Sequence, residues 1–253
     1  MKLASYNIRK AVGLDRRRDP GRVIDVVNGI EADVVMLQEA DRRLGMRPTA
    51  LPFRLIAEHT DFTFAALATN QVSLGWHGNA ILVRKGIEVS GATRIDLPGL
   101  EPRGAVSAVI AGRLRVVGVH LGLMRRHRHG QLRQIRRALD HCTLPTAVLG
   151  DFNEWSPHAG LEEFQDDYVM HAPGHSFHAA RPVAALDRIG LTRDIGFQGA
   201  GVVETQLSRI ASDHLPVWAE VDLPAPAPEF SEDSGEGFSE KPLPRALSAA
   251  LAG

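Results

Sequence analysis

A short, largely apolar run that ends on polar residues constrains the fold of this chain more than any other stretch. Residues 146–149 follow Pro145 and predict a buried strand, and Gly150 lets the backbone bend at its end. Because side chains alternate along a strand, we expect Asp151 and Asn153 to leave it on the same face. A carboxylate and an amide placed together suit a site that orients water or a hydroxyl group. An Asx-rich turn is the alternative interpretation.

The composition is that of an ordinary soluble globular protein. Of the 253 residues, 44% are hydrophobic and 23% are charged, and the length allows one large domain or two small ones. No apolar run approaches the roughly 18 residues that a membrane-spanning helix needs. The first seven residues lack the apolar core of a secretion signal, and Cys142 has no partner for an internal disulfide bond. We therefore expect a cytoplasmic protein.

Basic residues concentrate in two segments. Residues 113–137 contain eight arginines and no acidic residue, and a second cluster of six basic residues lies between Arg9 and Arg22. From Pro224 onward, five acidic residues face two basic ones, so residues 1–223 carry a formal charge of +2 against −1 for the whole chain. Such charge runs are usually solvated faces. Two arginine-rich segments in one domain also indicate an anionic ligand.

The first forty residues predict a strand–helix–strand unit. Residues 3–8 alternate as a strand ending on Asn7, and Asp19 with Pro20 marks a helix start by capping and by proline at the first position. Residues 33–39 form a continuous apolar strand that ends on Glu39. Polar groups at strand ends are where α/β proteins tend to place their chemistry. A salt bridge from Glu39 to Arg42 or Arg43 is the structural alternative.

The rest of the folded part is predicted to be rich in strands. We expect strands over residues 62–67, 79–83, 87–97, 105–110, 114–120, 183–189, 199–205 and 219–223, and helices over 130–142 and 157–164. The strand 114–120 ends on His120, and residues 183–189 carry Asp187. Asp213 and His214 lie on a turn before the last strand. Residues 224–253 are rich in Pro, Ser and Glu, so we expect a disordered tail after a catalytic domain of residues 1–223.

Eight polar residues fall at or near the ends of predicted strands: Asn7, Glu39, His120, Asp151, Asn153, Asp187, Asp213 and His214. Carboxylate and amide oxygens suit a hard cation such as Mg²⁺ or Mn²⁺. Histidines with carboxylate partners suit phosphate contact and proton transfer. A single cysteine and the lack of a histidine pair on any predicted helix argue against a structural zinc site. A glycine-rich phosphate loop and a Gly-x-Ser-x-Gly motif are both absent from the sequence.

Six motifs in this order resemble those of the endonuclease/exonuclease/phosphatase superfamily, which includes DNase I, and especially its compact bacterial members. They are Ser-Tyr-Asn7-Ile, Leu-Gln-Glu39, Val-His120-Leu, Gly-Asp151-Phe-Asn153, Leu-Asp187-Arg-Ile and Ser-Asp213-His214-Leu-Pro-Val. Together they span about residues 1–223. The resemblance implies an α/β protein with a DNase I-like four-layer sandwich, in which two packed mixed β-sheets are flanked by helices.

The resemblance also implies a role for each residue in a metal-dependent hydrolase. Glu39 would bind Mg²⁺ (or Mn²⁺) with Asn7 beside it, and Asp213 would support the metal side. Asp151 would orient or deprotonate the attacking water, and Asn153 would hold that water or a phosphate oxygen. His120 and His214 would contact the scissile phosphate, with Asp187 orienting His214. Abasic-site endonucleases of the family have a tyrosine where His120 stands, so the sequence favours the DNase, phosphodiesterase and phosphatase branches.

Three functions remain open at this point. The first is hydrolysis of a phosphoester substrate that is small or lipid-derived, and the second is cleavage of nucleic acid held by the arginine clusters. The third is a non-catalytic binding module. We expect Arg125, Arg126 and Arg128 to lie at the rim of the active site because they follow His120 closely. The charge of +2 and the lack of interleaved aromatic residues favour a single phosphoester. The sequence indicates no obligate protein partner.

Overall fold

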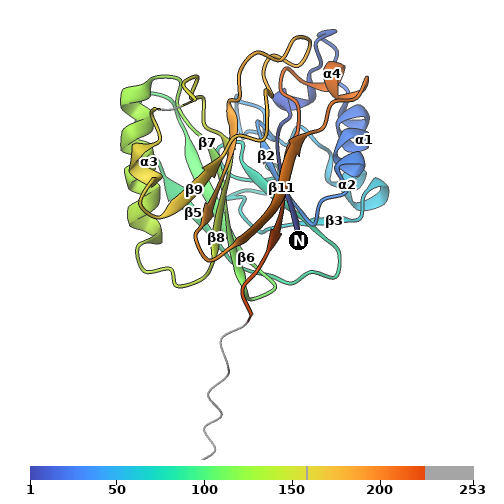
Figure 1. Cartoon of the computed structure of the whole chain (residues 1–253). Coiled ribbons are helices and arrows are strands. Elements are labelled where there is room, and N and C mark those ends of the chain that lie inside the picture. The colour runs from blue at the N-terminus through green and yellow to red at the C-terminus, as the bar shows by residue number, and fades with distance from the viewer. Residues whose placement is uncertain (158, 226–253) are drawn as a thin grey trace, which may run out of the picture.

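The structure is a computed structural model that describes residues 1–157 and 159–225. Two six-stranded β-sheets pack face to face, and helices cover their outer faces (Figure 1). This is the predicted four-layer α/β sandwich. The predicted disordered tail lies outside the described residues from residue 226 onward.

The first sheet has the strand order β11-β12-β1-β2-β4-β3. Its strands are β1 (Lys2–Asn7), β2 (Val34–Gln38), β3 (Phe62–Phe64), β4 (Ala80–Arg84), β11 (Gly196–Val202) and β12 (Val217–Asp222). Only β1 and β2 are parallel within this sheet, and helix α1 (Pro20–Ile30) makes the crossover between them.

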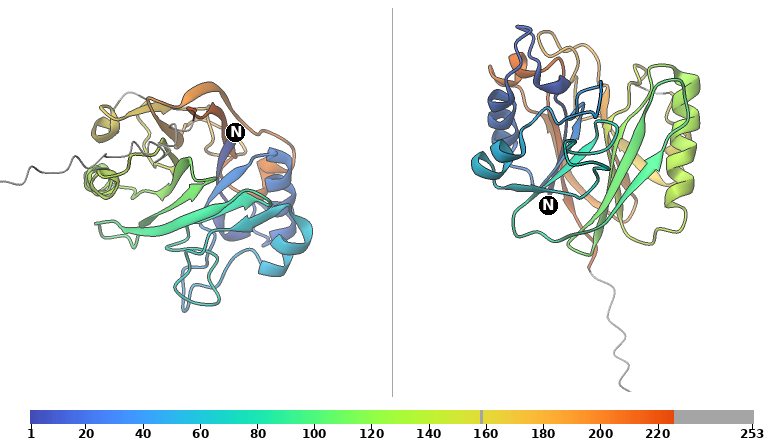
Figure 2. Two further views of the ribbon diagram at one scale, coloured as in Figure 1. Left: turned by 90° about the horizontal axis from the view of Figure 1, so that it is seen from below. Right: turned by 180° about the vertical axis from the view of Figure 1, so that it is seen from behind.

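The second sheet repeats this plan with the order β5-β6-β7-β8-β10-β9. Its strands are β5 (Val89–Asp96), β6 (Gly104–Ile110), β7 (Leu114–His120), β8 (Thr146–Asp151), β9 (Tyr168–His171) and β10 (Asp187–Thr192). Strands β7 and β8 are parallel and are joined by helix α3 (Arg125–Leu139). Both sheets are therefore mixed, and each has a strand–helix–strand crossover that places its helix on the outside (Figure 2).

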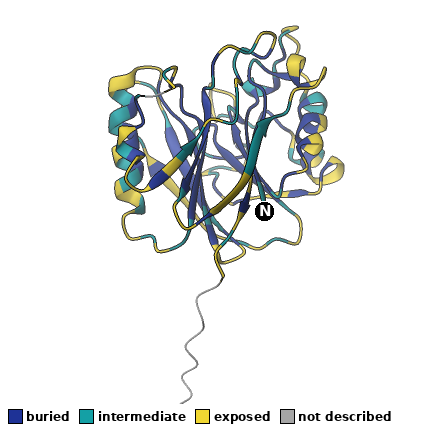
Figure 3. Ribbon diagram, viewed as in Figure 1, coloured by how far each residue is buried: buried dark blue, intermediate teal, exposed yellow. Residues whose placement is uncertain are grey.

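Three apolar layers hold the sandwich together. Leu3 and Met36 of the first sheet pack with Leu149 and Ile189 of the second in the central layer. One outer layer lies between the first sheet and α1, and the other lies between the second sheet and α3. Figure 3 shows the buried strands at the centre and the exposed outer faces of the helices. Burial on both faces explains why the central strands are continuous apolar runs.

Helix α1 begins as the sequence predicts. Asp19 is its N-cap and accepts a hydrogen bond from the backbone N–H of Arg22 at 3.0 Å, while Pro20 occupies the first helical position. The helix ends where Glu31 adopts a left-handed conformation with φ of 56°. In the described part of the chain, no helix is both long and apolar enough to cross a membrane.

Several predicted boundaries are wrong. Helix α3 begins at Arg125 and not at residue 130. The arginines of its first turn bind Glu154, which lies far away in the sequence. The strands predicted at 183–189 and 199–205 are shifted to β10 and β11, since their boundaries follow pairing with β8 and β12. The helix predicted from residue 157 shortens to a turn at Glu162–Phe164. Helices α2 (Phe53–His59) and α4 (Ser208–Ala211) were not predicted.

Strand alternation directs four polar side chains into the space between the sheets. Asn7 shares the inward face of β1 with Leu3, and Asp151 shares the inward face of β8 with Leu149. His120 and Asp187 end the inward faces of β7 and β10 in the same way. Because β7, β8 and β10 are neighbours, His120, Asp151 and Asp187 lie in register across the second sheet. The sandwich therefore ends in a row of polar groups.

Gly150 is required for the close pairing of β7 with β8. A Cβ atom at this position would lie 1.9 Å from the backbone oxygen of Val119, its partner in the neighbouring strand. We expect Gly150→Ala to destabilise the protein by about 3 kcal/mol, because a backbone atom cannot move aside without breaking the strand pairing. Urea unfolding followed by circular dichroism would measure the loss.

Gly29 provides the matched control. It lies in α1, where a Cβ atom would meet nothing within 4 Å, so Gly29→Ala should stabilise the protein by about 1 kcal/mol through helix propensity. Equal stability of the two variants would contradict the role assigned to Gly150.

Candidate active site

A hydrogen bond joins the two sheets at the polar end of the sandwich. Asn7 Nδ2 from the first sheet donates to Asp151 Oδ2 in the second at 3.1 Å. His120 Nε2 lies 3.4 Å from the same carboxylate oxygen. The three residues are 1–5% exposed, so the structure places them together in a buried cluster.

His214 completes this cluster from the turn before β12. Its Nδ1 lies 2.8 Å from Asp187 Oδ2, and its Nε2 lies 3.7 Å from Asp151 Oδ2. Ser176 also binds Asp187, donating its hydroxyl to Oδ2 at 2.5 Å. Sequence reasoning missed Ser176, because a serine in a loop carries no signal of its spatial neighbour. The arrangement holds one histidine between two carboxylates.

The buried charges shift the pKa values of this cluster in opposite directions. Burial alone would lower the pKa of His214, but the carboxylates of Asp187 and Asp151 raise it to about 9. Burial raises the pKa of Asp151 to about 6, despite the opposing charge of His214. Burial, together with Arg103 and His214, lowers the pKa of His120 well below its usual value. At neutral pH, His214 is therefore a cation, His120 is neutral, and Asp151 is a carboxylate close to its protonation range.

Asn153 lies beside Asp151 but not on the same strand face, so that part of the prediction is wrong. Strand β8 ends at Asp151, and Asn153 is left-handed with φ of 51°. The backbone N–H of Asn153 donates to Asp151 Oδ1 at 2.9 Å, which is the Asx turn that was the alternative. The Asn153 side chain donates to the backbone oxygen of Leu121 at 2.9 Å. The carboxylate of Asp151 is thus oriented by the backbone two residues further along as well as by the side chain of Asn7.

Glu39 and Asp213 lie at the same end of the sandwich and are paired with cations. Glu39 accepts a hydrogen bond from Lys10 Nζ and lies 3.7 Å from Arg43 Nη2, so the predicted pairing with Arg43 is present. Asp213 Oδ2 lies 3.3 Å from Arg9 Nε. Burial and neighbouring Arg43 lower the pKa of Lys10 to about 8. These basic residues surround the acids that the sequence assigned to a metal.

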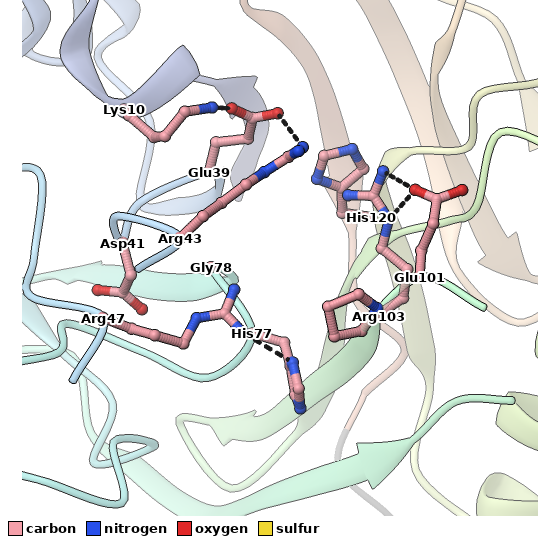
Figure 4. Close-up of a pocket in the computed structure, with 11 residues that line it drawn as sticks. Lys10, Glu39, Asp41, Arg43, Arg47, His77, Gly78, Glu101, Arg103 and His120 are labelled. Carbon is pink, nitrogen blue, oxygen red and sulfur yellow. Dashed lines mark hydrogen bonds and ion pairs between the residues drawn. The ribbon is translucent and has the colours of Figure 1, made fainter. Parts of the chain in front are cut away.

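A pocket of about 180 Å³ opens next to Glu39 and His120. Figure 4 shows basic side chains projecting around it from several loops. Its charged and histidine lining consists of Lys10, Arg43, Arg47, Arg103, His77 and His120 together with Glu39, Asp41 and Glu101. This excess of cations at a pocket suits a ligand that carries negative charge.

The oxygen donors at this end of the sandwich fit a partly hydrated Mg²⁺ or Mn²⁺. The candidates are the Glu39 and Asp213 carboxylates and Asn7 Oδ1, which accepts one hydrogen bond from the Arg9 backbone at 3.1 Å and keeps a second lone pair. Among the described residues, no group of three or more His, Cys, Asp or Glu side chains is close enough to hold a metal. Mg²⁺ commonly binds through one or two protein oxygens and retains several waters, so a magnesium site can consist of fewer protein ligands than such a group.

Two of the three arginines expected at the rim are already paired within the protein. Arg125 Nη2 lies 2.7 Å and Arg128 Nη2 lies 2.6 Å from the carboxylate of Glu154, which is 1% exposed. Arg128 is itself buried, while Arg126 is exposed. Burial would raise the pKa of Glu154, but these arginines and the Ser156 N–H lower it to about 2. Arg125 and Arg128 therefore neutralise an acid of the chain.

Asp187 is expected to keep His214 charged. In the metal-free protein, His214 should be protonated at neutral pH and lose its charge as the pH rises through about 9. Asp187→Asn should move this titration to lower pH, because it removes the nearest negative charge. Titration of the histidine ring signals by NMR would measure the change.

Asp194→Asn is the control, since Asp194 lies in the exposed turn after β10. A His214 titration that is the same in wild type and Asp187→Asn would show that Asp187 does not hold the charge.

Comparison with known proteins places this geometry among related folds. A model of the endonuclease/exonuclease/phosphatase family matches residues 4–214. The Escherichia coli (strain K12) protein YbhP is 28% identical over 244 residues, which cover 88% of this chain and 96% of YbhP.

Two solved structures illustrate the range of relatives with this fold. A mannosyl-6-phosphatase of Bacteroides thetaiotaomicron superposes with a TM-score of 0.66 at 15% identity, covering 88% of this chain and 99% of its own. D. rerio TDP2, solved with a single-strand DNA product, also gives a TM-score of 0.66, at 16% identity and 88% and 98% coverage. At such low identity these likenesses show a shared fold.

Proposed function

The chain belongs to the endonuclease/exonuclease/phosphatase family, and from this premise we propose that it is a metal-dependent hydrolase of a small phosphoester. The observation that supports this most is the buried cluster in which Asp151 contacts Asn7, His120 and His214 beside a cation-lined pocket. The reaction is in-line attack of water on phosphorus: a P–O bond to the water oxygen forms, the P–O bond to the alcohol breaks, and the alcohol leaves with a proton.

Asp151 is the proposed general base. A pKa of about 6 leaves it ionised at neutral pH, while its basicity exceeds that of an ordinary aspartate. A base titrating near the working pH is the most effective for proton transfer. The hydrogen bonds from Asn7 and from the Asn153 backbone orient its two oxygens. We assign Asn153 to hold the attacking water or a phosphate oxygen nearby.

His214 is the proposed cation that stabilises the charge developing on the phosphoryl group. Its raised pKa keeps it protonated, and Asp187 with Ser176 fixes its ring. A preorganised charge in a site that excludes water stabilises a transition state more than a solvated one does. His120 is neutral and contributes a hydrogen-bonding ring to the same phosphate. Of the two histidines, His214 is therefore the one proposed to act as an imidazolium cation.

Glu39 and Asn7 are the proposed ligands of Mg²⁺ or Mn²⁺, with Asp213 in support. When bound, the ion would polarise a phosphoryl oxygen and offset negative charge in the transition state. Lys10 and Arg9, which pair with Glu39 and Asp213, hold these carboxylates at the same end of the sandwich.

The arginine pairing supports a small phosphoester over nucleic acid. Arg125 and Arg128 share the single carboxylate of Glu154, so together they offer a phosphate backbone a net charge of +1 and not +2. Trp76 packs against Gly104 and the central apolar layer, so it is poorly placed to stack on a base. Exposed Arg126 and the shared fold of a DNA-bound relative keep a nuclease as the second candidate. Nucleic-acid affinity that falls steeply between low and physiological salt would favour that candidate.

Asp151→Asn is expected to reduce kcat at least about 100-fold, because the amide cannot accept the proton of the attacking water. Phosphate release from a panel of sugar phosphates, inositol phosphates and phospholipids would identify the substrate and measure this loss. Asp25→Asn, an exposed change on α1, should leave kcat unchanged. Wild-type turnover by Asp151→Asn would remove Asp151 from the mechanism.

Removal of divalent cations is expected to abolish hydrolysis. Activity should disappear in EDTA and return with Mg²⁺ or Mn²⁺, and Glu39→Gln should raise the Mg²⁺ concentration needed, because an amide lacks the ligand charge of a carboxylate. Calorimetric titration with Mg²⁺ would compare the two proteins directly. Hydrolysis that persists in EDTA would show that no exchangeable metal is needed.

A further inference from the structure

Arg47 differs from the other lysine and arginine side chains of the pocket because it forms no ion pair among the described residues. Lys10 and Arg43 pair with Glu39, and Arg103 pairs with Glu101 at 2.7 Å. For Arg47, no carboxylate lies within 4 Å in the part of the chain that the structure describes, and its Nε is buried without a hydrogen-bond partner there. A half-buried guanidinium in this state has no directly paired anion to offset its desolvation, since Asp41 acts on it only from beyond 4 Å.

The one hydrogen bond of the Arg47 guanidinium in the described structure leaves its charge intact. Arg47 Nη1 lies 3.0 Å from His77 Nδ1. An arginine can only donate, so His77 must accept through Nδ1 and be the neutral tautomer with its proton on Nε2. Burial, reinforced by Arg47, lowers the pKa of His77 and agrees with this state. His77 therefore orients the guanidinium without supplying a negative charge.

Asp41, an acid of the pocket lining whose charge interacts with Arg47, binds the backbone. Asp41 accepts hydrogen bonds from the N–H groups of Leu74 at 2.7 Å and Gly75 at 3.4 Å, and it is 2% exposed. Its carboxylate fastens the loop after β2 to the loop before β4. Both Asp41 and Arg47 line the pocket, and the charge of Arg47 acts on Asp41, but the two side chains form no ion pair within 4 Å.

Arg47 lies at the far end of the pocket from the proposed metal ligand. Figure 4 shows Lys10 and Glu39 at one end and Arg47 with His77 at the other, with Arg43 and Gly78 between them. Because one pocket connects the two ends, a ligand whose phosphoester reaches His120 can also reach Arg47.

We infer that Arg47, oriented by His77, is a subsite for a second anionic group of the substrate, a phosphate or carboxylate remote from the scissile phosphoester. This inference rests on the proposed function and narrows its substrate class to small phosphoesters that carry two acidic groups. A planar guanidinium matches the oxygens of either group and forms charge-assisted, bidentate hydrogen bonds with them.

The test uses matched substrates that differ only in the second charge. These are the monophosphates and bisphosphates of propanediol, butanediol and hexanediol, which also sample the span between the two groups. Wild-type protein should have a KM at least about tenfold lower for the best bisphosphate than for its monophosphate, as expected for one hydrogen-bonded charge pair. Arg47→Gln should raise KM for the bisphosphate about tenfold more than for the monophosphate, and Arg47→Lys should restore part of the preference.

Arg181→Gln is the matched control, since it removes an equal charge from an exposed loop position outside the pocket. It should leave the preference for bisphosphates unchanged. Thermal melting of each variant would confirm that it is folded.

Two results separate this inference from the proposed function. Equal loss of both substrates in Arg47→Gln, or an unchanged preference, would overturn the subsite while leaving phosphoester hydrolysis in place. If wild-type protein hydrolyses none of the substrates, the proposed function fails. In that case, calorimetry would compare the binding of the same mono- and bisphosphates to wild type and to Arg47→Gln. Tighter binding of the bisphosphate by wild type, lost in Arg47→Gln, would support the subsite. Equal binding of the two ligands would overturn it.

Discussion

The hydrogen bond from Asn7 to Asp151 is the interaction on which the candidate site depends. It connects β1 of one sheet to β8 of the other at the end where the apolar central layer stops. A buried carboxylate is costly unless donors and cations meet it, and here Asn7, His120 and His214 surround one oxygen of Asp151 while the Asn153 N–H binds the other. The packing of the sheets and the arrangement of the site therefore depend on each other.

The same burial gives the two histidines different roles. His214 lies between Asp151 and Asp187 and remains charged, whereas His120 faces His214 and Arg103 and remains neutral. Residues of one type thereby supply a cation and a neutral hydrogen-bonding group within one cluster. This difference comes from the partners that each ring meets.

The sequence patterns were accurate where a strand's own residues determine its environment. The apolar runs predicted β2, β7 and β8, and strand alternation then accounts for the inward direction of Asn7, His120, Asp151 and Asp187. Asp19 and Pro20 likewise predicted the start of α1 from local chemistry alone. One prediction failed because a distant partner acts: α3 starts at Arg125 because Glu154 binds its first turn. The other failure is local, since the backbone N–H of Asn153 bonds to Asp151 in an Asx turn and leaves the strand.

By itself, the sequence indicated the family through the resemblance of six motifs. Side-chain chemistry and local periodicity predicted most of the strands that carry polar residues and pointed to the eight candidate residues. Only the tertiary structure decided which charges are neutralised. Glu154 pairs with Arg125 and Arg128, Glu101 pairs with Arg103, and Arg47 lies beside His77 with no carboxylate within 4 Å among the described residues. Ion pairing depends on distances between residues far apart in the chain, so a count of arginines could not show which of them remains free for a ligand.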